Sequence, residues 1–364
     1  MDRTTSSIVR DLQNMASPTA SPGTLAASVV RSESARSAQS AENVERMHAH
    51  LEAEFKSVQS QHPDMALAVV GVHVLADWIR QSNASTMMEL QIEVKAAADH
   101  IKSVASESLA VSCGCELFMR HVTRTTLEIP DFDACKESLS QRGHHYLEMT
   151  LKSRQKIAEL GSEFVRDGSV VLVHGYSRCV QSLLLHAGQQ QGKRFSVMVT
   201  ESAGQGYQLA RNLLPHGFPV TVIADTAIGS VMERVNVVLV GAEGVVENGG
   251  VLNCVGTFSL AVMAKALSKP FYVASESYKF ARMYPLSQAD VPNPSVKAGT
   301  AADASKLHAS EHLEGLREEG LLEKLRVETP IRDYTPPEYI TLMFTDLGVL
   351  TPSAVSDELI QLYY

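Results

Sequence analysis

The chain has 364 residues, of which 45% are hydrophobic, so it is long enough to bury a core and to divide into two domains. Its formal net charge of −9 argues against a nucleic-acid binder, which needs basic surface to neutralise phosphates. No apolar run reaches the roughly eighteen residues of a membrane span, and the five cysteines lack the paired spacing of a structural zinc site. We therefore expect a soluble, cytoplasmic protein with reduced thiols, without a metal and without membrane contact.

The first 45 residues are rich in Ser, Ala and Thr and hold few apolar residues. Such a composition cannot offset the entropy cost of ordering, so residues 1–45 are predicted to be a flexible tail. Arginines in this segment raise the alternative of a transit peptide, which the acidic residues Asp2, Asp11 and Glu33 disfavour.

Residues 46–166 show the periodicity of helices. Leu67, Val70, Val74 and Trp78 recur at steps of three and four, which predicts a helix that follows Pro63 and Asp64. Further helices are predicted over 87–104, 114–127 and 132–160. We expect this half of the chain to be an all-helical N-terminal domain.

From residue 167 onward the pattern changes to short apolar runs separated by helical segments. This alternation predicts a parallel sheet covered on both faces, that is, a Rossmann-like doubly wound α/β domain over 167–364. Residues 291–335 interrupt it with prolines and a charged helix candidate at 301–326, and are predicted to be a surface-exposed insertion. A final helix is expected after Thr351 and Pro352. The predicted strands are 169–174, 195–200, 219–224, 235–240, 271–275 and 339–344.

Polar side chains follow every predicted strand. Because parallel strands end at one edge of the sheet, these residues are expected to form a common rim where ligands bind. For Asp225 and Asp346 we favour the simpler interpretation that they cap the following helices. Lys279 is equally well interpreted as a solvated lysine or as a ligand contact. The rim consists of His174, Glu201, Asp225, Glu243, Glu276, Lys279 and Asp346.

Two segments of this rim predict an anion site. The residues from His174 to Arg178 open a helix, where free backbone amides attract negative charge. Glu243 begins a run rich in glycine, GAEGVVENGG at 241–250, which is predicted to turn and present its carboxylate to a ligand. The candidate residues for binding a sugar phosphate or another anion are His174, Tyr176, Ser177, Arg178, Glu243, Asn253, Gly256, Thr257 and Lys279.

Common nucleotide motifs do not fit. The run GQQQGK at 188–193 has three residues between its glycines, where a P-loop has four. The first strand is followed by HGYSR rather than by GxGxxG, which argues against a dinucleotide site. No nucleophile elbow is recognisable. We therefore expect no cofactor.

Several longer strings resemble the alpha subunits of eukaryotic translation initiation factor 2B, over roughly residues 47–364. The wider superfamily includes the beta and delta subunits, methylthioribose-1-phosphate isomerase and archaeal ribose-1,5-bisphosphate isomerase. The strings are HPDMA at 62–66, CELF at 115–118, VHGYSR at 173–178, VTES at 199–202, GAEGVVENGG at 241–250, KPFYVASESYKF at 269–280 and FTDLGVLTPSAVSDELIQLY at 344–363.

This resemblance implies a role as well as a fold. It implies a homodimer, formed through the α/β domain, that bridges the beta, delta, gamma and epsilon subunits of the guanine-nucleotide exchange factor for initiation factor 2. It also implies that the subunit is regulatory and helps to sense the phosphorylated alpha subunit of initiation factor 2. Exchange catalysis would belong to another subunit, and no direct contact with nucleic acid is expected.

The alternative is a sugar-phosphate aldose-ketose isomerase of the same superfamily. Those enzymes carry a cysteine where this chain has Gly175, an aspartate where it has Glu243, and a lysine where Cys254 follows Asn253. Glycine cannot transfer a proton, and Cys179, one turn into the helix, points elsewhere. We therefore expect a non-catalytic subunit with a retained rim that binds a sugar phosphate or a nucleotide monophosphate.

Overall fold

The computed structural model describes residues 44–62, 65–292 and 330–363. The predicted tail, apart from its last two residues, and the helix candidate at 301–326 lie outside the described residues. In the unit Met1–Ala53, residues 44–53 are helical. The second unit, Glu54–Tyr364, contains helices α3 to α10, helix α13 and both sheets.

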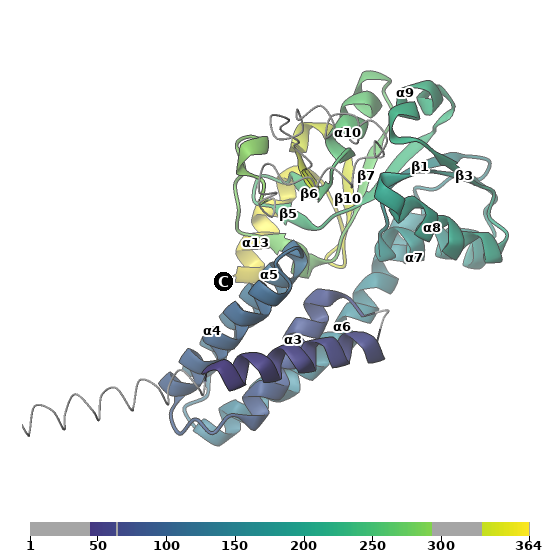
Figure 1. Cartoon of the computed structure of the whole chain (residues 1–364). Helices are drawn as coiled ribbons and strands as arrows, with labels where there is room; N and C mark the ends of the chain where they lie inside the picture. Colours follow the sequence, from purple (N-terminus) through teal and green to yellow (C-terminus); the bar gives the residue numbers. More distant parts are fainter. Residues whose placement is uncertain (1–43, 63–64, 293–329, 364) are drawn as a thin grey trace, which may run out of the picture. The chain divides into compact units, whose positions relative to one another are not determined.

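Helices α3 to α6 precede the first strand, after the helical residues 54–61, and confirm the predicted helical part of the fold (Figure 1). Side chains fix two of their starts: Thr86 Oγ1 accepts from Glu89 N at 3.2 Å, and Asp131 Oδ2 accepts from Ala134 N at 2.8 Å. None of the helices in the described part of the chain is both long and apolar enough to cross a membrane. The helices are α3 Leu67–Gln81, α4 Met87–Val104, α5 Leu109–Glu128 and α6 Phe132–Ser162.

Small residues allow these helices to pack closely. A Cβ added at Gly143 of α6 would lie 2.1 Å from Ala76 Cβ of α3, and one added at Gly114 of α5 would lie 3.1 Å from Ala68 Cβ. Helix α3 therefore contacts both α5 and α6 through positions where no larger side chain fits.

The predicted Rossmann-like sheet is confirmed. It has seven strands in the order β11-β10-β7-β4-β1-β2-β3, and all pairings are parallel except that of β10 with β11. Strand order reverses between β1 and β4, as in doubly wound folds. The strands are β1 Val170–His174, β2 Ser196–Thr200, β3 Val220–Ile223, β4 Val237–Gly241, β7 Phe271–Ala274, β10 Leu342–Phe344 and β11 Val349–Leu350.

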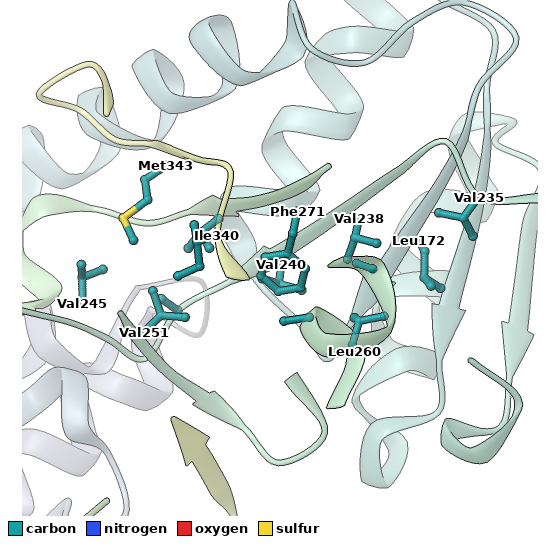
Figure 2. Close-up of a cluster of buried hydrophobic side chains, with 14 of the residues drawn as sticks. Leu172, Val235, Val238, Val240, Val245, Val251, Leu260, Phe271, Ile340 and Met343 are labelled. Atoms are coloured by element: carbon teal, nitrogen blue, oxygen red, sulfur yellow. The ribbon is translucent and has the colours of Figure 1, made fainter. Parts of the chain in front are cut away.

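Alternate residues of the central strands pack into two different cores. Val171 and Val173 of β1 belong to a cluster with α6, α7 and α8, whereas Leu172 belongs to a cluster with α9, α10 and α13. Figure 2 shows the second cluster, which includes Val238 and Leu260. Both faces of the sheet are thus covered. The helices are α7 Arg178–Leu185, α8 Gln205–Leu213, α9 Ile228–Val231, α10 Thr257–Ala266 and α13 Val355–Tyr363.

A second, mixed sheet corrects two sequence predictions. Residues 241–250 are not simply a turn. They contain strand β5, which pairs as an antiparallel hairpin with β6, the strand that follows them. Residues 291–335 are not entirely an exposed insertion, because β9 at their end is buried and pairs with β6. The order is β8-β5-β6-β9, formed by β5 Gly244–Val246, β6 Val251–Cys254, β8 Phe280–Ala281 and β9 Arg332–Thr335.

Replacing Gly206 by alanine should destabilise the fold, because the new Cβ would lie 1.9 Å from Thr200 O, a backbone atom that cannot easily move. We expect the free energy of unfolding, measured by urea denaturation, to fall by about 2–3 kcal/mol, as for overpacked cores. Gly229→Ala is the matched control, since its Cβ would meet only Met263 Sδ at 3.9 Å. Equal stability of the two variants would contradict the prediction.

Candidate functional site

A cavity of about 190 Å³ lies at the carboxyl ends of β1 and β4, where the strand order reverses. This is the position at which open α/β sheets bind ligands, because the connections from the two strands leave in opposite directions. Seven of the nine candidate residues line it: His174, Tyr176, Ser177, Arg178, Glu243, Asn253 and Lys279.

The other two candidates support the wall without lining it. The amides of Gly256 and Phe258 donate to Asp333 Oδ2 at 2.7 and 3.0 Å, so they are not directed at the cavity. Thr257 Oγ1 donates to Cys254 O at 2.7 Å and accepts from Asn253 Nδ2 at 3.0 Å. Thr257 thus orients Asn253, whereas Asp333 caps the start of α10.

Two acidic residues of the predicted rim also have structural partners. Asp225 Oδ1 accepts from Ser202 N at 3.0 Å, and Asp346 Oδ1 accepts from Ser277 N at 2.7 Å. They therefore hold the starts of neighbouring 3₁₀ turns, and the interpretation that they cap the helices following them is wrong. Neither they nor Glu201 line the cavity.

Three helices begin at the cavity wall. Ala66 precedes α3, Ser108 precedes α5, and Ser177 precedes α7. No side chain caps the first turn of α3 or α5, while Ser177 Oγ accepts from Val180 N at 3.4 Å. Arg178, the first residue of α7, adds a positive charge. This concentration of helix starts favours an anionic ligand.

A buried charge cluster forms the floor. Lys279 Nζ lies 2.9 Å from Glu276 Oε2 and donates to Ala242 O at 3.0 Å; the two ionic side chains are 15% and 2% exposed. The interpretation of Lys279 as a solvated lysine is therefore wrong. Arg154 of α6 places Nη2 3.7 Å from Glu276 Oε1. No pattern in the sequence indicated Arg154, because its position depends on how α6 packs on the sheet.

The pKa values follow from these contacts. Burial, the largest single effect, raises the pKa of Glu276, but the charge and hydrogen bond of Lys279 together with Arg154 and Cys179 outweigh it and lower the pKa to about 2. Burial alone would lower the pKa of Lys279, but Glu276 outweighs it and raises the pKa above its usual value. The pair is thus ionised across the neutral range.

His174 is a structural residue of the wall. Its Nε2 lies 2.9 Å from Val255 O, which can only accept, so Nε2 carries the proton and Nδ1 accepts from Thr200 Oγ1 at 2.6 Å. Burial lowers the pKa of His174 below its ordinary value. The imidazole is therefore neutral, with both nitrogens occupied.

Gly175 is required by its surroundings. Its φ is +72°, and an added Cβ would lie 2.7 Å from Cys254 Sγ and 3.1 Å from Gln205 Oε1. Cys254 Sγ thus fills the space that a side chain at position 175 would need. Burial raises the pKa of the Cys254 thiol to about 11, so it is protonated at neutral pH.

Glu243 forms an ion pair that the sequence did not predict. Its Oε2 accepts from Nε of Arg332, a residue of β9 that is 4% exposed. Position 332 falls in the segment expected to be an exposed insertion. Only the register of β9 against β6 could have identified it.

Comparisons with known proteins identify relatives. The model of the Initiation factor 2 subunit family matches residues 60–352. The chain is 45% identical over 318 residues to the translation initiation factor eIF2B subunit alpha of Dictyostelium discoideum, covering 85% of this chain and 96% of that one. It is 31% identical to the corresponding subunit of Caenorhabditis elegans, covering 85% and 97%. The resemblance to alpha subunits is confirmed.

Solved structures agree on the fold. A crystal structure of the Pyrococcus horikoshii translation initiation factor eIF-2B matches with a TM-score of 0.61 at 21% identity, covering 85% of this chain and 98% of that one. A chain of the tetrameric eIF2B-beta2-delta2 complex from C. thermophilum matches with a TM-score of 0.66 at 20% identity, covering 88% and 95%. At these identities the likeness concerns the fold alone.

Asp333 predicts a pH dependence of stability. Burial raises its pKa from 3.8 to about 6, so its contribution to stability is present below about pH 4 and is lost as the pH rises through 6. Asp333→Asn removes this titration. In urea titrations at a series of pH values, the stability of the wild type relative to the variant should fall by about 3 kcal/mol between pH 4 and 7. A constant difference would contradict this assignment.

Proposed function

The chain belongs to the Initiation factor 2 subunit family, and we propose that it is a regulatory and assembly subunit of the guanine-nucleotide exchange factor for initiation factor 2. The observation that carries this proposal is the 45% identity to a eukaryotic alpha subunit over nearly that subunit's whole length. In this proposal the protein acts in the cytoplasm as a homodimer that joins the beta, delta, gamma and epsilon subunits. It also helps to sense the phosphorylated alpha subunit of initiation factor 2.

The outward face of α10 supports a dimer with a second copy. Val262 and Met263 are 38% and 37% exposed, and the neighbouring Val255 and Leu267 are 46% and 44% exposed. A helix that buries one apolar face and exposes another is suited to pack against a partner. We propose this face as part of the homodimer interface.

Met263→Glu should weaken the dimer, because the interface would have to bury an unpaired charge. Analytical ultracentrifugation should show a dimerisation constant weakened by about tenfold or more, equivalent to about 1.4 kcal/mol. Met88→Glu on α4, at a methionine that is 73% exposed, is the matched control and should leave the dimer intact. A wild-type chain that is monomeric at micromolar concentration would refute the bridging role.

The cavity supports a second element of the proposal, a small regulatory ligand. Its volume of about 190 Å³ is below the roughly 300–1,000 Å³ of sites for drug-sized molecules. This size favours a monosaccharide phosphate over a nucleotide monophosphate. The helix starts and Arg178 suit the phosphate, and the carboxylate of Glu243 suits hydroxyl groups.

Arg178→Ala should weaken binding of ribose 5-phosphate, the probe for this site. We expect the Kd measured by calorimetry to rise by about tenfold or more, because a hydrogen bond between charged groups is lost. Arg211→Ala, at an exposed arginine of the adjacent α8, should bind like the wild type. If both variants lost the same affinity for ribose 5-phosphate, or if neither lost any, the cavity would not be the binding site.

We further propose that the bound sugar phosphate is not converted. Gly175 stands where the isomerases carry a cysteine. The protonated thiol of Cys254 occupies the space that a side chain at position 175 would need. Incubation with ribose 1,5-bisphosphate or methylthioribose 1-phosphate should leave each compound unchanged. Turnover that disappears in Glu243→Gln would instead support the isomerase alternative.

A further inference from the structure

The guanidinium of Arg332 links Glu243 in the cavity wall to the backbone of Pro292. Its Nε donates to Glu243 Oε2, and its Nη1 donates to Pro292 O at 3.0 Å. The Arg332 side chain is only 3% exposed, whereas that of Glu243 is 34% exposed. The cation is thus enclosed by protein, and the carboxylate has one side in the cavity.

Strand pairing fixes both partners. Arg332 of β9 pairs with Cys254 of β6, and Glu243 N donates to Leu252 O of the same strand at 2.9 Å. The two backbones are therefore held by one small sheet. A fork-shaped guanidinium that binds two acceptors on this frame has little freedom to turn.

This arrangement leaves one carboxylate oxygen of Glu243 for a ligand. Across residues 44–62, 65–292 and 330–363, no group hydrogen-bonds to Glu243 Oε1. An ionised carboxylate only accepts hydrogen bonds, so its natural ligand partners are hydroxyl groups. The phosphate of the same ligand would be held by the helix starts and Arg178, which carry the positive charge of the wall.

We infer that Arg332 is a positioning residue that determines selectivity: by fixing Glu243, it allows the cavity to prefer hydroxylated phosphates over inorganic phosphate. This inference rests on the proposed binding of a sugar phosphate. It assigns Arg332 no contact with the ligand, because its charge is directed at Glu243 and Pro292.

The test compares two probes, ribose 5-phosphate and inorganic phosphate, by calorimetry on the full chain. In Arg332→Met, the Kd of ribose 5-phosphate should rise by about tenfold, the loss expected when a hydrogen bond to a charged group is no longer well formed. The Kd of inorganic phosphate should stay within about twofold of the wild type, a difference of less than half a kcal/mol by the usual conversion. Arg332→Lys should restore only part of the preference, since an ammonium lacks the planar fork.

Glu243→Ala provides the matched variant on the other side of the pair. Glu243→Ala should lose the preference for ribose 5-phosphate over inorganic phosphate. Adding Arg332→Met to this variant should cause no further loss, because both changes remove the same interaction between the two side chains. Arg332→Met leaves Glu243 without its buried partner, which destabilises the fold, although Glu243 is 34% exposed and can be hydrated. Unchanged phosphate binding also verifies folding.

The outcomes separate the two proposals. If the wild type prefers ribose 5-phosphate and Arg332→Met keeps that preference, or weakens both probes equally, the role of Arg332 is refuted while the ligand site stands. If the wild type binds both probes equally, the selectivity inference is refuted and an anion site remains. If it binds neither, the proposed ligand and this inference fall together.

Discussion

The reversal of strand order between β1 and β4 is the constraint on which the site depends. Because connections diverge there, a space opens at the carboxyl edge that neither set of crossover helices fills. Both central strands are buried on both faces, so well-packed side chains hold the two strand ends that border this space. The starts of α3 and α5 close the space from the helical part, and so the cavity combines groups from segments more than a hundred residues apart.

Charge compensation then decides what the cavity can hold. Glu276 neutralises Lys279 in the floor, and Arg332 neutralises Glu243 in the wall, while His174 is neutral. A buried charge without a partner destabilises a protein strongly, so the stability of the fold depends on these pairs whether or not a ligand binds. In the proposed site, the helix starts and Arg178 would face the phosphate, and a carboxylate oxygen of Glu243 would accept hydroxyl groups. A polar anion with hydroxyls satisfies both.

The sequence predicted those features that local periodicity encodes. Helix α4 has the predicted bounds, and six apolar runs correspond to the six parallel strands, because burial on both faces leaves a continuous apolar signal. The second sheet escaped prediction because its strands have only two to four residues, and β5 and β6 include or adjoin glycines. Arg332 and Arg154 escaped for another reason, because both are placed by tertiary packing: Arg154 reaches the cavity, and Arg332 reaches Glu243 from 89 positions away.

The relation between Gly175 and Cys254 bears on the proposal that the rim binds a ligand without converting it. A side chain at position 175 would collide with Cys254 Sγ and would also have to adopt a φ of +72°. A single change to cysteine at 175 would therefore be strained while Cys254 keeps its position. Cys254 is itself a poor substitute as a base, since burial raises its pKa to about 11 and Ser202 and Thr257 hold it at 3.7 and 3.9 Å. Two positions would have to change together, which supports the proposal that the rim now serves binding without reaction.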